Sequence, residues 1–114
     1  MKHLDSIPLT ANQYQALVDL QQRVADLYDI TQMILYGSVA RSEADEESDL
    51  DLLLVTAQPL SRPARHEITD VVFDVNLRDG TNISTLVVDC HAWNEGPVSV
   101  LPLREEILKD GVVL

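Results

Sequence analysis

Two aspartates in one short segment have the residue type and the spacing of a divalent-cation site. Residues 48–52 read Ser-Asp-Leu-Asp-Leu, followed by Leu53 and Leu54. On a strand, residues i and i+2 point to the same face about 7 Å apart, so Asp49 and Asp51 would present their carboxylates side by side. Two such carboxylates repel each other, which raises the pKa of one of them. A hard cation relieves this repulsion, and Mg²⁺ is commonly held by one or two carboxylates together with substrate phosphates.

A second group of residues, just upstream, could bind those phosphates. Residues 35–41 read Leu-Tyr-Gly-Ser-Val-Ala-Arg. Gly37 permits backbone conformations that a Cβ forbids and allows a phosphate to approach closely. The Ser38 hydroxyl and the following backbone N–H groups can form an anion-binding concavity, and Arg41 can direct its guanidinium fork toward the same phosphates. The two segments together predict metal-assisted phosphoryl transfer.

The surrounding pattern predicts alternating helices and strands that would position these residues. Apolar spacing and a Thr10-x-x-Gln13 capping box indicate a helix from Thr10 to about Leu27. A second helix is expected from Arg62 to Leu77, with Gly80 as its C-terminal cap. The other expected elements are strands at 33–36, 49–55 and 83–88, a turn or short helix at 39–43, a helix at 103–109 and a terminal edge strand at 112–114. This order predicts an α/β (α+β) fold with a small mixed β-sheet flanked by helices.

Length, charge and composition restrict the class of protein. The 114 residues predict a single domain over 1–114. A formal net charge of −11 argues against direct nucleic-acid binding and against docking on anionic lipid. Cys90 is the only cysteine, so an internal disulfide is excluded, and no apolar run reaches the ~20 residues of a membrane span. With no secretory signal visible in the first residues, we expect a cytoplasmic protein.

The motif pair resembles the signature of the minimal nucleotidyltransferase group within the DNA polymerase β-like superfamily. That signature is Gly-Ser-x-x-Arg-Gly, a short spacer and then Ser-Asp-x-Asp before an apolar residue; this chain reads GSVAR and then SDLDLLL. The resemblance implies the nucleotidyltransferase fold, with nucleotide binding at Gly37, Ser38, Arg41 and Ser48. It also implies that Asp49 and Asp51 are catalytic and hold Mg²⁺ or Mn²⁺.

The sequence departs from this family pattern at two places. Ser42 stands where a glycine commonly follows the motif arginine. Active members also add a third carboxylate from a neighbouring strand, whereas the matching strand here, 83–88, has no acid in its interior. Asp89 lies at the far end of that strand and would serve as a metal ligand only if the register shifted.

The resemblance implies transfer of a nucleoside monophosphate, AMP from ATP, to an acceptor hydroxyl on a partner protein. Such domains are often paired with a small helical HEPN-type protein in toxin–antitoxin systems, and a partner contact through Trp93 or Leu101 is the first to test. The alternative is a weakly active or inactive module of the same fold that binds and neutralises its partner by contact alone. Transfer to a small molecule such as an aminoglycoside is a third, weaker alternative.

Several other residues have simpler structural interpretations. On an extended chain Cys90 and His91 would point to opposite faces, so we expect a half-buried thiol and a surface imidazole rather than a catalytic pair. Trp93, near the end of a β-segment, is expected to pack in the core, and Tyr36 to be buried in the sheet. The acidic residues between 43 and 47 are expected to form a solvated loop.

Overall fold

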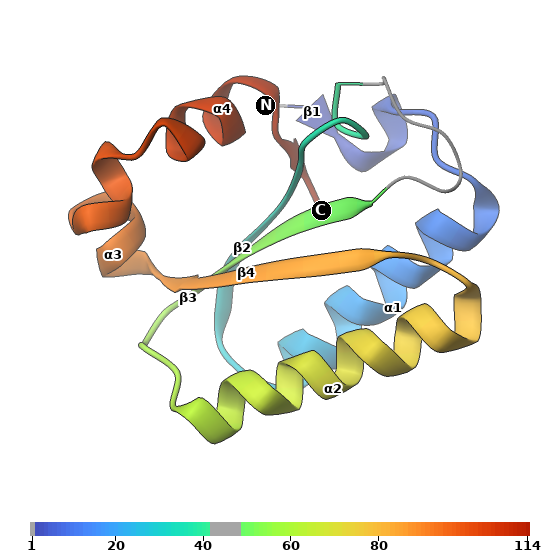
Figure 1. The fold of residues 1–114 in the computed structure, drawn as a ribbon, viewed down its shortest axis with the longest axis horizontal. Helices are drawn as coiled ribbons and strands as arrows, with labels where there is room; N and C mark the ends of the chain where they lie inside the picture. Colours follow the sequence, from blue (N-terminus) through green and yellow to red (C-terminus); the bar gives the residue numbers. More distant parts are fainter. Residues whose placement is uncertain (1, 42–48) are drawn as a thin grey trace.

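The computed structural model describes residues 2–41 and 49–114, which form a mixed sheet with helices on both faces (Figure 1). The strands follow the order β1-β5-β2-β3-β4, with β1 parallel to β5 and β3 parallel to β4, while β2 is antiparallel to both β5 and β3. The predicted fold class, a small mixed β-sheet flanked by helices, is therefore confirmed. The strands are β1 (Lys2–His3), β2 (Ile30–Tyr36), β3 (Leu50–Thr56), β4 (Ile83–Asp89) and β5 (Val112–Val113); the helices are α1 (Ala11–Leu27), α2 (Arg62–Asp79), α3 (Cys90–Asn94) and α4 (Pro102–Asp110), and short 3₁₀ turns cover Leu4–Ser6 and Pro97–Val100.

The two long helices begin and end at residues whose side chains or backbone suit those positions. Thr10 and Gln13 form the predicted capping box at the start of α1, with each side chain bonded to the other residue's backbone. The hydroxyl of Ser61 accepts from the Ala64 amide at the start of α2. Gly80 ends α2 with a φ of 67°, in the left-handed region that glycine enters without steric cost.

Alternation along β3 separates two cores. Leu50, Leu52 and Leu54 pack with α1 and α2 on one face of the sheet. Leu53 and Val55 pack on the other face with Trp93 of α3 and Ile107 of α4. Figure 1 shows α1 and α2 together below the sheet and α3 and α4 above it. Because side chains alternate along a strand, Asp51 lies on the face that carries α3 and α4, at the strand end where it stays partly exposed.

Three local predictions are wrong. Cys90 and His91 are not extended, because the Asp89 carboxylate caps the short helix α3 that contains both. Their predicted exposure is nevertheless confirmed, since the Cys90 thiol is half-buried and His91 is exposed. Trp93 belongs to this helix rather than to a β-segment, although it is buried in the core. The terminal strand β5 lies between β1 and β2, so β1 forms the edge of the sheet instead.

None of the helices in the described ranges is long and apolar enough to cross a membrane.

Candidate active site

The glycine–serine motif forms a tight turn at the end of β2. Gly37 has a φ of 82°, and the Arg41 amide donates to the carbonyl oxygens of Gly37 (3.3 Å) and Ser38 (3.2 Å). Val39 and Ala40 are buried in the core shared with α1 and α2, so the turn is held from its inner side. Gly37 and Ser38 stay half-buried, where a ligand can reach them. We call residues 37–41 the phosphate turn, after the role that the sequence predicts for it.

The two halves of the motif meet in the structure. Tyr36 pairs with Asp51 across β2 and β3, and this places the Asp51 carboxylate against the backbone of Gly37. A Cβ added to Gly37 would lie 2.6 Å from Oδ2 of Asp51, closer than real Cβ atoms approach an oxygen. Gly37 suits this position because of its positive φ, and a Cβ here would also force the Asp51 carboxylate to shift.

The carboxylate pair lies in an electrostatically unfavourable position when no cation is present. Burial raises the pKa of Asp51, and the negative charge of Asp49 raises it further. Burial and the nearby Asp51 carboxylate also raise the pKa of the Tyr36 phenol, which is half-buried rather than buried as the sequence predicted. A bound divalent cation would favour the charged form of Asp51. Two carboxylates, one of them exposed at Asp49, are a donor set that suits Mg²⁺ or Mn²⁺.

Strand β4 places Ser84 beside Asp51. The parallel register pairs Asp51 with Ser84, and the Asn76 side chain of α2 anchors the start of β4. Asn76 Oδ1 accepts from the Ile83 amide (2.8 Å), and its Nδ2 donates to the Ile83 carbonyl (3.0 Å). The position next to the carboxylate pair on this strand is thus an exposed hydroxyl residue. In residues 2–41 and 49–114, no three His, Cys, Asp or Glu side chains gather closely enough to hold a metal ion.

Asp89 does not join the carboxylate pair. The register is continuous from Leu50–Ile83 to Thr56–Asp89, so Asp89 lies at the opposite end of β3 from Asp51. Thr56, the partner of Asp89, lies five residues along β3 from Asp51, which corresponds to about 16 Å. Its carboxylate accepts from the Ala92 amide at 3.1 Å and caps α3. The structure thus gives Asp89 a structural role and places it away from the carboxylate pair, contrary to the prediction that it could be a metal ligand.

Arg41 and Ser48 are the remaining predicted site residues. Arg41 contributes its amide to the phosphate turn and has an exposed side chain, while Ser48 lies outside the described residues. One residue that the sequence did not indicate also contacts the turn: Lys2 donates from Nζ to the Ala40 carbonyl at 3.0 Å. The two residues are 38 positions apart, and no local pattern connects them.

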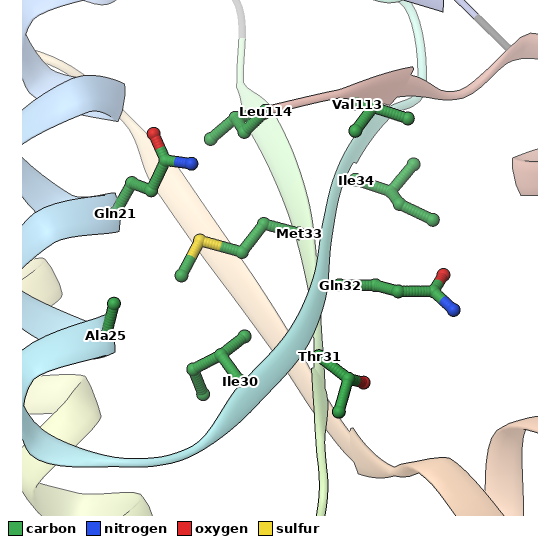
Figure 2. Close-up of a pocket in the computed structure, with 9 residues that line it drawn as sticks. All are labelled: Gln21, Ala25, Ile30, Thr31, Gln32, Met33, Ile34, Val113 and Leu114. Carbon is green, nitrogen blue, oxygen red and sulfur yellow. The ribbon is translucent and has the colours of Figure 1, made fainter.

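A groove of about 420 Å³ lies elsewhere, between α1 and β2 (Figure 2). Met33, Ile30 and Leu114 point toward Ala25 and Gln21 of α1, whereas Thr31, Gln32, Ile34 and Val113 point away. Its lining residues are apolar or uncharged, and none belongs to the motif. The side chains that line the groove therefore carry no titratable group.

Comparisons with known proteins agree with the motif. The sequence profile of the family described as "Nucleotidyltransferase domain" matches residues 17–114, which is most of the chain. A curated relative, "Putative protein adenylyltransferase MJ1305" of Methanocaldococcus jannaschii, is 41% identical over 63 residues. That alignment covers 54% of this chain and 43% of the relative, so the chain matches less than half the length of that protein.

Solved structures show the same fold at low sequence identity. One described as a "putative minimal nucleotidyltransferase" aligns with a TM-score of 0.55 and 23% identity, over 88% of this chain and 94% of that one. A toxin–antitoxin structure with AMP-PNP aligns with a TM-score of 0.58 and 15% identity, over 91% of this chain and 72% of that one.

Proposed function

Because this chain belongs to the nucleotidyltransferase domain family and has the fold of its minimal type, we propose that it transfers AMP from ATP to a hydroxyl group on a partner protein, with Mg²⁺ or Mn²⁺ as cofactor. The observation that carries the proposal is the contact between the Asp51 carboxylate and the Gly37 backbone. This contact would bring a cation held by Asp51 directly beside the phosphate turn. A triphosphate bound by the turn and a cation bound by Asp51 would then share one site.

Each motif residue has a defined task in this proposal. Asp49 and Asp51 would hold the cation, which when bound neutralises phosphate charge and polarises the α-phosphate. Ser38 would donate a hydrogen bond from its hydroxyl to a phosphate oxygen, and Gly37 would let the phosphates approach the backbone. Arg41 would pair with phosphate oxygens through its guanidinium. Ser48 is proposed as a nucleotide-binding residue from the motif alone. The chain's own residues would thus bind and orient the triphosphate so that the acceptor hydroxyl attacks the α-phosphate in line with the bond to the β-phosphate, which breaks to release pyrophosphate.

The proposed acceptor is a side chain of a small helical, HEPN-type protein with a basic surface. A net charge of −11 would speed association with a positively charged partner and would make that association salt-dependent. Val100 and Leu101 are exposed at 83% and 48% and could supply the apolar part of the contact. Trp93 cannot do so, because only 2% of it is exposed. The curated relative's name and the toxin–antitoxin structure support a protein acceptor.

The experiment is an AMP-transfer assay with the product of an adjacent gene. The two purified proteins are mixed with ATP and Mg²⁺, and the intact mass of each is measured. We expect one or more AMP units on the partner, none in EDTA, and none with the Asp49→Asn/Asp51→Asn variant. Lys109→Met, a surface change on α4, is the control that should keep full activity. A partner that binds firmly but is never modified would refute protein adenylylation.

One observation favours a second candidate function, a module that neutralises its partner by contact alone. The strand position beside Asp51 is Ser84, which has no carboxylate to complete the site or to activate the acceptor hydroxyl. A binding module predicts that the Asp49→Asn/Asp51→Asn variant still neutralises the partner. An enzyme predicts that neutralisation is lost while the complex still forms.

A further inference from the structure

Lys2 lies outside the motif, yet it contacts the phosphate turn through its side chain. Its Nζ donates to the carbonyl oxygen of Ala40 at 3.0 Å. Ala40 is completely buried, and it precedes Arg41, whose amide closes the turn onto Gly37 and Ser38. The carbonyl groups at the end of such a turn have no partner within it, so a lysine ammonium there acts as a C-terminal cap.

The position of Lys2 is fixed from two directions. Lys2 belongs to the edge strand β1, and its backbone pairs with Val112 of β5, so it is anchored to the sheet. Two residues later, Leu4 is buried in the same core as Val39 and Ala40 of the phosphate turn. The chain around Lys2 therefore fixes its backbone beside the turn, while holding the exposed side chain in place still costs rotamer freedom.

We propose that Lys2 is a positioning residue that keeps the phosphate turn in its nucleotide-binding conformation. It acts through the Ala40 carbonyl and is not required to touch the nucleotide. The inference rests on the proposed function in one respect, namely that the turn binds the triphosphate. If the turn is formed in only a fraction of molecules, the apparent association constant for MgATP is the intrinsic constant multiplied by that fraction.

Three variants separate this role from a general effect of charge. Lys2→Met keeps the length of the side chain and removes the donor, whereas Lys2→Arg keeps a charged donor. Lys109→Met removes the only other lysine in the chain, at the exposed end of α4, and causes the same change in net charge. Amide hydrogen exchange at Arg41 measures the opening of the turn without any nucleotide, and exchange at Leu53 reports on the centre of the sheet. Calorimetry measures the dissociation constant of ATP in excess Mg²⁺.

For Lys2→Met we expect Arg41 to exchange about tenfold faster, the ratio that the loss of one charge-assisted hydrogen bond produces. Leu53 exchange should change much less. The MgATP dissociation constant should rise by less than about tenfold, by the same factor as the fall in the fraction of molecules whose turn is formed. Lys2→Arg and Lys109→Met should resemble the unmodified protein in both measurements.

The inference is overturned if Lys2→Met leaves Arg41 exchange unchanged, or if exchange shows the turn open in a large fraction of molecules while MgATP affinity does not fall. Equal weakening by Lys2→Met and Lys109→Met would show a net-charge effect and would also overturn it. If the unmodified protein does not bind MgATP, the proposed function fails, while Arg41 exchange still decides whether Lys2 caps the turn.

Discussion

Replacing Gly37 with alanine would place a methyl group where the Asp51 carboxylate now lies. The added Cβ would be 2.6 Å from Asp51 Oδ2, 3.5 Å from Cγ and 3.7 Å from Cβ. Only the carboxylate oxygen is in conflict, since the other two distances are ordinary contacts. The φ of 82° is a second, independent source of strain for any residue with a Cβ.

These two costs can be separated with variants of Asp51. Alanine at a left-handed φ costs about 1–2 kcal/mol, and overpacking against a neighbour costs about 1–3 kcal/mol. In the unmodified protein Gly37→Ala should therefore lower the free energy of unfolding by about 2–5 kcal/mol. In an Asp51→Ala background the oxygen is gone, and the cost should fall to the backbone part, about 1–2 kcal/mol. Asp51→Asn keeps an atom in the same place without the charge, so the full cost should remain.

Urea denaturation of the six proteins, without metal, gives the coupling free energy between the two positions. We expect about 1–3 kcal/mol of coupling with Asp51→Ala and almost none with Asp51→Asn. If Gly37→Ala costs the same in all three backgrounds, the carboxylate does not pack against the turn. The geometric basis of the site would then be refuted.

Three further predictions follow from the same geometry. Burial and the charge of Asp49 raise the pKa of Asp51 above its usual 3.8, so folding stability is lost as the pH rises from 3.8 through that raised pKa. Asp51→Asn should therefore raise the urea midpoint at pH values above the raised pKa and give no gain below pH 3.8. Ser84→Asp should destabilise the metal-free protein but speed AMP transfer in Mg²⁺, measured by the rate of partner labelling, and an unchanged rate would show that a third carboxylate is not limiting. Asp89→Ala should leave transfer unchanged and cost about 0.5–2 kcal/mol through loss of the α3 cap, so loss of transfer in a folded variant would contradict the position found for Asp89.

The sequence allowed prediction of those features that depend on neighbouring residues. The Thr10–Gln13 capping box and the Gly80 cap are local hydrogen-bonding and backbone effects, and both are confirmed. Gly37 was predicted to adopt an unusual backbone conformation, and its φ of 82° agrees. The meeting of Gly37 and Asp51 follows from the β2–β3 pairing; the apolar runs on either side of the motif predicted the two strands but not their pairing.

Features that depend on tertiary contacts were not predicted. Strand β1 has two residues, too few for a periodic pattern, and it exists because β5 is beside it. The contact from Lys2 to Ala40 depends on that pairing and so could not be found from spacing. Helix α3 was interpreted as extended chain because its five residues lack a helical pattern, and the Asp89 cap that starts it also serves as the end of β4.

Calorimetric titration of ATP into the protein, with Mg²⁺ and then with EDTA, tests the central claim most directly. The claim is that the phosphate turn and the Asp49–Asp51 pair form one metal-dependent nucleotide site. We predict saturable binding of ATP in Mg²⁺, and little binding in EDTA, because the half-buried Asp51 and the exposed Asp49 would repel an unaccompanied triphosphate. Equal binding with and without the metal ion would contradict the claim.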